Sequence, residues 1–127
     1  MLNTATTTIG DQAGSTGTVD VLGPGSTLNS TGTSVAGGSG SGTLNITDGG
    51  AVNTGTTTIA QNTGSTGTVT VDGSGSQLND TGTLNVAPSG TGVLDVTNGG
   101  AVNAGGGTTV GPNGTIMGAS AKWQGGT

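Results

Sequence analysis

Residues 42–53 read GTLNITDGGAVN, and the fold of the chain can be worked out from this stretch. Leu44 and Ile46 alternate with polar residues, with the period of two that is typical of a half-buried strand. The Asp-Gly-Gly sequence at residues 48–50 is a turn signal, because Asp and Gly accept the backbone angles of tight turns. A second short apolar segment, centred on Val52, follows at once. The stretch therefore predicts two short strands joined by a tight turn.

The same arrangement returns about every 25 residues from one end of the chain to the other. Four apolar columns result, the last of them on a third short strand: Val19, Leu44, Val69 and Leu94; Val21, Ile46, Val71 and Val96; Leu2, Leu28, Val52, Leu78 and Val102; and Ile9, Val35, Ile59, Val86 and Val110. Apolar residues that recur at intervals of 20 to 50 residues indicate a solenoid, in which each coil buries its inward side chains against the next. We therefore predict an all-β fold, a three-faced parallel β-helix (solenoid) of about five coils of about 25 residues, with three short strands per coil.

The repeat covers residues 1–118, which we expect to form a single β-helix domain. Residues 119–127 depart from the repeat and are predicted to form a C-terminal tail or cap, with Lys122 and Trp123 as its main side chains. Met1 leads directly into repeat material without a signal peptide. We interpret it as an artificial start or as one end of an excerpt from a longer chain.

A larger unit of 50 residues is superimposed on the 25-residue repeat. Residues 14–19 recur at 64–69, and residues 49–53 recur at 99–103. Two coil types therefore alternate along the chain, and duplication of a pair of coils accounts for the pattern.

The composition by itself would favour a disordered chain, since 28% of the residues are hydrophobic, 1% are aromatic and 30 are glycine. The regular placement of the aliphatic residues overrides that expectation. There is no cysteine, which excludes disulfides and thiolate metal sites. A net charge of −5 with one basic residue argues against nucleic acid as a partner. No apolar run reaches 18 residues, so we expect no membrane span.

One polar column has the same residue in every coil. An asparagine follows the apolar residue of each second strand: Asn3, Asn29, Asn53, Asn79 and Asn103. Stacked amides can both donate and accept hydrogen bonds from coil to coil. We interpret this column as a structural asparagine ladder, with a ligand-binding stripe as the alternative.

The candidates for catalysis and metal binding are six aspartates, namely Asp11, Asp20, Asp48, Asp72, Asp80 and Asp95. Asp20 and Asp95 share a column three coils apart, on the order of 14 Å, wider than the roughly 5–9.5 Å that paired glycosidase carboxylates need. Residues 37–44 are similar to a glycine-rich calcium nonapeptide, but Gly42 stands where the aspartate ligand belongs. We therefore predict that the chain is not an enzyme and has no catalytic, cofactor or metal site.

The third strand carries threonines that we expect to point outward: Thr6, Thr8, Thr56, Thr58, Thr83 and Thr109. A regular threonine array on a flat solenoid face can match the spacing of ice. In this chain the array is broken in alternate coils, for example by Gly32 and Ser34. The high β-propensity of threonine is the alternative explanation.

Residues 42–53, followed by Thr56 to Ala60 and a Gly/Ser loop, resemble the repeat associated with type V secretion and PEP-CTERM proteins. The resemblance covers about residues 2–118, and the sequence also resembles the passenger segment of a large bacterial autotransporter of the adhesin-like kind. It implies a right-handed β-helix on a Gram-negative cell surface, exported across the outer membrane, and therefore an extracellular location. It brings no catalytic residues with it.

We therefore predict a structural and adhesive surface protein, in which the β-helix is a stiff stalk segment. The main alternative is a filament subunit that stacks head to tail, since the two ends of the chain are complementary and no polar cap is evident at the first coil. The partners would then be further copies of the chain, or further repeats of a parent chain, in addition to an unknown surface ligand. Ice binding through the threonine array is a third hypothesis.

Overall fold

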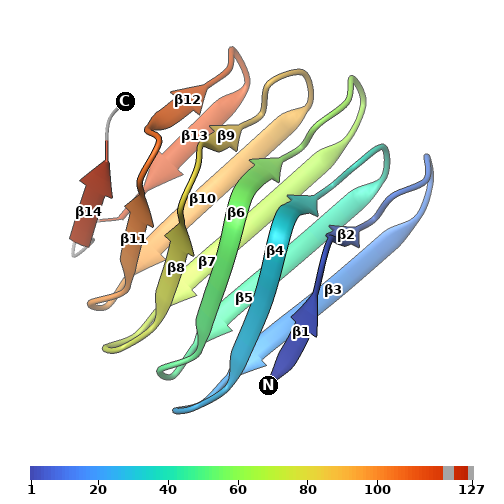
Figure 1. Ribbon diagram of the computed structural model, residues 1–127. Helices are drawn as coiled ribbons and strands as arrows, with labels where there is room; N and C mark the ends of the chain where they lie inside the picture. The colour runs from blue at the N-terminus through green and yellow to red at the C-terminus, as the bar shows by residue number, and fades with distance from the viewer. Residues whose placement is uncertain (119–121, 126–127) are drawn as a thin grey trace.

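The computed structural model describes residues 1–118 and the backbone of residues 122–125. The described chain contains strands, turns and loops but no helix, and the strands pair in parallel. In Figure 1 the strands of the front layer run upward, those of the back layer run downward, and the chain advances from right to left. A chain that follows this path forms a right-handed coil. The prediction of a right-handed parallel β-helix of about five coils is confirmed.

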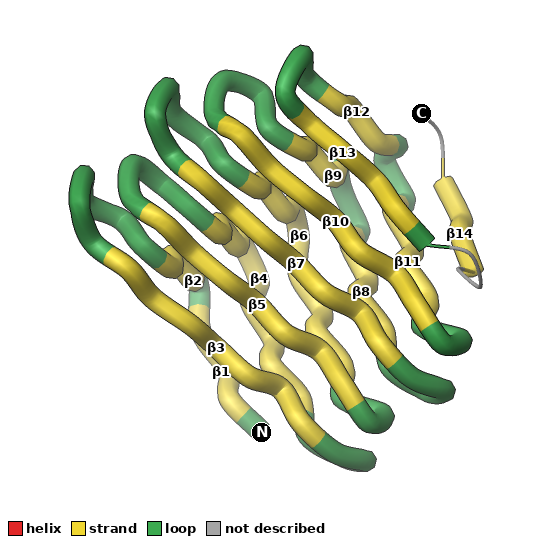
Figure 2. Tube along the Cα trace, turned by 180° about the vertical axis from the view of Figure 1, so that it is seen from behind, coloured by secondary structure: helices red, strands yellow, loops and turns green. Residues whose placement is uncertain are grey.

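The first strand of each coil belongs to a five-stranded sheet. The sheet is formed by β3 (Thr16–Leu22), β5 (Ser41–Thr47), β7 (Thr66–Asp72), β10 (Thr91–Thr97) and β13 (Gly114–Met117). Figure 2 shows these strands side by side in one layer. Leu44 pairs with Val19 on one side and Val69 on the other, so the predicted apolar column is present. The ladder has no register shift from β3 to β10.

The second and third strands of each coil share one nine-stranded sheet. Its members are β1 (Leu2–Thr4), β2 (Thr7–Ile9), β4 (Thr27–Ala36), β6 (Ala51–Ile59), β8 (Gln77–Asp80), β9 (Leu84–Val86), β11 (Ala101–Ala104), β12 (Thr108–Val110) and β14 (Lys122–Gly125). In two coils the predicted second and third strands run together as the single strands β4 and β6. In the others a short break separates them. The three strand segments of a coil thus form two hydrogen-bonded sheets.

The core lies between the two sheets and consists of stacked aliphatic side chains. Those of the central coils, such as Ile46, Val71 and Leu78, are fully buried. Each buried aliphatic stabilises the fold by roughly 1.5–3 kcal/mol, which offsets the entropy of ordering a glycine-rich chain. Because every column continues into the next coil, the core is a rod and not a sphere.

The predicted column on the third strand is wrong at one position. Ile9 and Ile59 pair with Ala36 and not with Val35, which lies one residue earlier and faces the other side of the strand. The reason is a bulge in β4, whose register shifts between Ser30 and Thr33. One extra residue moves every later side chain to the opposite face.

A column of glycines fills the inward positions where the five-stranded sheet begins. Gly17, Gly42, Gly67, Gly92 and Gly114 pair with one another in register. A Cβ added at Gly67 would overlap with the carbonyl oxygen of Ala36 and would lie 2.6 Å from the amide nitrogen of Ala60. The backbones of the two sheets therefore touch along this edge, and no side chain can separate them.

The turn after each first strand contains two residues with a left-handed backbone, and the second of them is always a glycine. The first alternates between glycine and a small polar residue: Gly23 (φ 96°), Asp48 (φ 52°), Gly73 (φ 99°) and Asn98 (φ 50°). Gly, Asn and Asp are the residues that adopt this conformation most readily. The alternation is the local structural basis of the 50-residue unit.

Part of the predicted C-terminal tail continues the solenoid. Strand β14 pairs in parallel with β11, so that Val102 lies opposite Trp123 in the ladder. The backbone at Lys122 and Trp123 therefore occupies the second-strand position of a further coil. The rest of the predicted tail, residues 119–121 and 126–127, lies outside the described residues.

Candidate functional site

The five asparagines predicted to stack form a continuous ladder on the outside of the nine-stranded sheet. Asn29, Asn53, Asn79 and Asn103 each donate a hydrogen bond from Nδ2 to the Oδ1 of the asparagine one coil earlier, at 2.8, 2.9, 2.9 and 2.6 Å. They come together because parallel in-register strands place equal positions side by side. Every amide points the same way along the rod, with its N–H toward the first coil.

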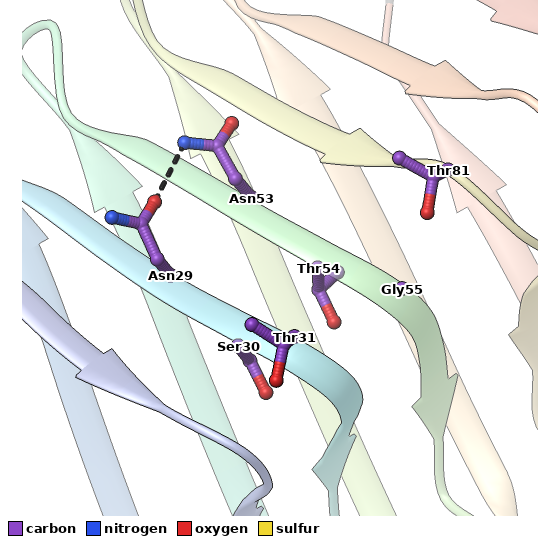
Figure 3. A pocket seen from close by; sticks show the side chains of 7 residues that line it. All are labelled: Asn29, Ser30, Thr31, Asn53, Thr54, Gly55 and Thr81. Atoms are coloured by element: carbon purple, nitrogen blue, oxygen red, sulfur yellow. Dashed lines mark hydrogen bonds between the residues drawn. The ribbon is translucent and has the colours of Figure 1, made fainter.

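A shallow hollow of about 280 Å³ lies beside the ladder, where the second strand bends into the third. Figure 3 shows the Asn29 and Asn53 amides joined by their hydrogen bond at one end of this hollow, with Thr31, Gly55 and Thr81 around it. Its lining is uncharged and consists of amides, hydroxyls and backbone. An arrangement of this kind can donate and accept hydrogen bonds, but it contains no acid, base or nucleophile activated by a neighbouring base.

We expect Asn53→Ala to lower the free energy of unfolding by about 1–2 kcal/mol, because it removes two hydrogen bonds of the ladder at once. Asn53 donates to Asn29 and accepts from Asn79. Urea unfolding followed by far-UV circular dichroism measures the change. The control is Asn3→Ala, which removes a single bond at the end of the ladder. Equal losses in the two variants would contradict the ladder's role in stability.

A buried polar column runs along the inside of the same bend. Ser30, Thr54, Asp80 and Ala104 pair in register and all face inward. Asp80 is only 4% exposed, and its Oδ1 accepts a hydrogen bond of 2.7 Å from the Thr57 hydroxyl. Its Oδ2 has no protein partner within the described residues. Burial raises the pKa of Asp80 to about 7, although the hydrogen bond from Thr57 acts in the opposite direction.

Asp72 has the opposite environment. It is the last residue of β7 and lies on the outer surface of the five-stranded sheet. Its Oδ1 accepts hydrogen bonds from the Thr97 hydroxyl at 2.6 Å and from the Asn98 amide at 2.7 Å. These bonds lower the pKa of Asp72 from its ordinary value, against a smaller effect of burial. This carboxylate oxygen is thus already used for bonding between coils.

The other predicted carboxylates do not converge. Asp20 and Asp95 share one column, as expected, and Asn45 and Thr70 lie between them. Asn45 donates a hydrogen bond of 2.8 Å to Asp20. Within the described residues, no group of three or more metal-ligating side chains comes together. The same part of the chain has no helix long and apolar enough to cross a membrane.

The threonines predicted to form an outward array on the third strand are not brought into a continuous row. Thr8, Thr58 and Thr109 share one column, but Val35 and Asn85 alternate with them. Thr58 is only 7% exposed and is therefore not part of an accessible face. Thr6, Thr8 and Thr109 are exposed, whereas Thr56 and Thr83 are half-buried.

Ser34 was expected on the same outer face, and this expectation is wrong. It pairs with Thr7 and Thr57 in the inward column and is 3% exposed. The bulge in β4 is again the cause, because it reverses the side on which residues 34–36 point.

Sequence reasoning also missed the buried position of Asp80. The signal was present, because Asp80 lies two residues after Leu78, and side chains two apart on a strand face the same way. By the same alternation, Asn79 faces outward and Asp80 faces inward.

No protein-family model, no curated protein and no solved structure matches this chain. The class of the protein therefore rests on its own geometry, which is that of a parallel β-solenoid.

Proposed function

We propose that this chain is a structural module of a bacterial surface protein, a stiff stalk segment of the autotransporter-adhesin kind, which acts outside the cell. Its function would be mechanical: the rod would hold an adhesive segment away from the cell envelope. No catalytic role is included in this proposal.

The observation that carries the proposal is the unbroken stacking of coils. Both sheets, the aliphatic columns and the asparagine ladder continue from coil to coil through residues 1–118. Backbone hydrogen bonds across loops also join neighbouring coils, for example from Thr66 to Gly40 and from Thr91 to Ser65, each at 3.0 Å. A rod that is bonded on all sides resists bending. The resemblance of residues 42–53 to surface-protein repeats supports the same role.

A spacer should change its length in proportion to its number of coils. We expect insertion of a second copy of residues 42–91 after Thr91 to lengthen the rod by about 9–10 Å, since two coils are added at about 4.8 Å each. Small-angle X-ray scattering measures the maximum dimension of the particle. The control is an insertion of the same 50 residues in scrambled order, which should not extend the rod. An unchanged length with the native insert would contradict the proposal.

A self-assembling filament subunit is the second candidate, and exposed aliphatic residues at the two ends of the rod favour it. Leu2 on the first coil is 58% exposed and Ile116 near the last coil is 39% exposed, although both belong to columns that are buried in the central coils. A second copy stacked head to tail would bury these side chains. In the scattering experiment, a maximum dimension that rises with the concentration of the parent chain would favour this candidate over a monomeric spacer.

A further inference from the structure

The outer face of the five-stranded sheet carries a lattice of small hydroxylated side chains. One column consists of Thr16, Ser41, Thr66 and Thr91, and the next, two residues along each strand, consists of Thr18, Thr43, Thr68, Val93 and Thr115. We call this set the hydroxyl face. Neighbours are about 4.8 Å apart between coils and about 6.6 Å apart along a strand. All of these side chains are exposed or half-buried.

The hydroxyl face is held rigidly in place. Between its two columns runs the inward glycine column, including Gly42 and Gly67, whose backbone lies directly against the opposing sheet. Threonine and valine also have few allowed side-chain rotamers. The positions of the methyl and hydroxyl groups are therefore fixed in two dimensions, and Val93 preserves the shape of the threonine that it replaces.

The hydroxyl groups of this face are available to an external partner. The side-chain hydrogen bonds of the described residues join other groups, such as Ser26 to Leu22 and Thr57 to Asp80, and none of them uses the hydroxyl face. The two columns contain no charged residue. The nearest acidic column, which includes Asp20 and Asp95, begins two residues further along the strands.

We propose that the hydroxyl face binds ice. A crystal of water presents oxygen atoms in a repeating planar lattice whose short spacing is close to the distance between β-strands. Threonine offers both a hydroxyl group that bonds to such water and a methyl group that rests between the water molecules. A crystalline polysaccharide is the competing flat partner, but the face has no aromatic ring on which a sugar could stack. This proposal does not depend on the role as a spacer.

The test is the thermal hysteresis of the parent chain and the shape of ice crystals grown in its presence. We expect a gap between the melting and freezing points, together with faceted crystals. The double variant Thr43→Tyr/Thr68→Tyr places two bulky groups at the centre of the hydroxyl face and should lose most of this gap. Its far-UV circular dichroism should remain that of the parent, because both side chains point outward.

The matched control is Thr6→Tyr/Thr8→Tyr, which adds the same rings to exposed threonines within β2 of the other sheet and just before it. It should retain the activity. The proposal would be overturned by the absence of hysteresis at the highest soluble concentration of the parent. Equal loss in both double variants, or co-sedimentation with microcrystalline cellulose without any effect on ice, would overturn it as well.

Discussion

Gly67→Ala is expected to lower the free energy of unfolding by at least about 3 kcal/mol, or to prevent folding altogether. The added methyl group would meet the carbonyl oxygen of Ala36, the amide of Ala60 and, at 2.9 Å, the side chain of Ile59. Two of these atoms belong to the backbone, which cannot move aside without breaking its own sheet. Urea unfolding followed by far-UV circular dichroism measures the effect.

The control is the adjacent substitution Thr66→Ala, on the exposed side of the same strand. It removes a larger part of a side chain, yet it should change the stability by no more than about 0.5 kcal/mol. A Gly67→Ala variant as stable as the Thr66→Ala variant would show that the two sheets are not in backbone contact along this edge.

Raising the pH from about 4 to 7 is expected to destabilise the protein, through Asp80. An unfolded aspartate loses its proton near its ordinary pKa of 3.8, whereas folded Asp80 keeps its proton up to about pH 7. Between these values the unfolded state binds fewer protons, so the free energy of unfolding falls as the pH rises, and it levels off above 7. The contribution that is lost is about 2–4 kcal/mol. Urea titrations at pH 4.5, 6 and 8 measure this slope.

The variant that tests this assignment is Asp80→Asn, which cannot ionise and still offers an oxygen to the Thr57 hydroxyl. It should flatten the decline between pH 4 and 7 and should be more stable than the parent at pH 8. Asp72→Asn is the matched control. The lowered pKa of Asp72 supports the fold above its unfolded pKa and stops doing so as the pH falls below about 4, so this variant should leave the decline intact. A decline that persists in Asp80→Asn would refute the assignment.

The aliphatic columns made most of the fold predictable. Leu44 and its equivalents recur at the same interval, and each one marks the inward side of a strand. The bulge in β4 could not be predicted in this way, because the extra residue lies between Ser30 and Thr33, where no apolar residue marks the register. Val35 and Ala36 are both apolar, so either could have belonged to the column.

The candidate sites were likewise predictable only where a recurring residue type marks equivalent positions in successive coils. The asparagine ladder was predictable because one residue type occupies one position in every coil. The inward column of Asp80 changes from serine to threonine, aspartate and alanine, so residue type alone does not reveal that these positions are equivalent. The hydroxyl face has no marker of this kind, because threonine and valine are common in any β-strand.

The asparagine ladder also has a direction, which affects how the rod comes apart. Each amide donates toward the first coil and accepts from the next one, so the side-chain dipoles add along the axis and polarise one another. An interior amide is secured on both sides, whereas Asn3 and Asn103 are each secured on one side within the ladder. Unfolding should therefore begin by fraying of the outermost coils. In a longer rod the central coils should be better protected from unfolding than in a short one.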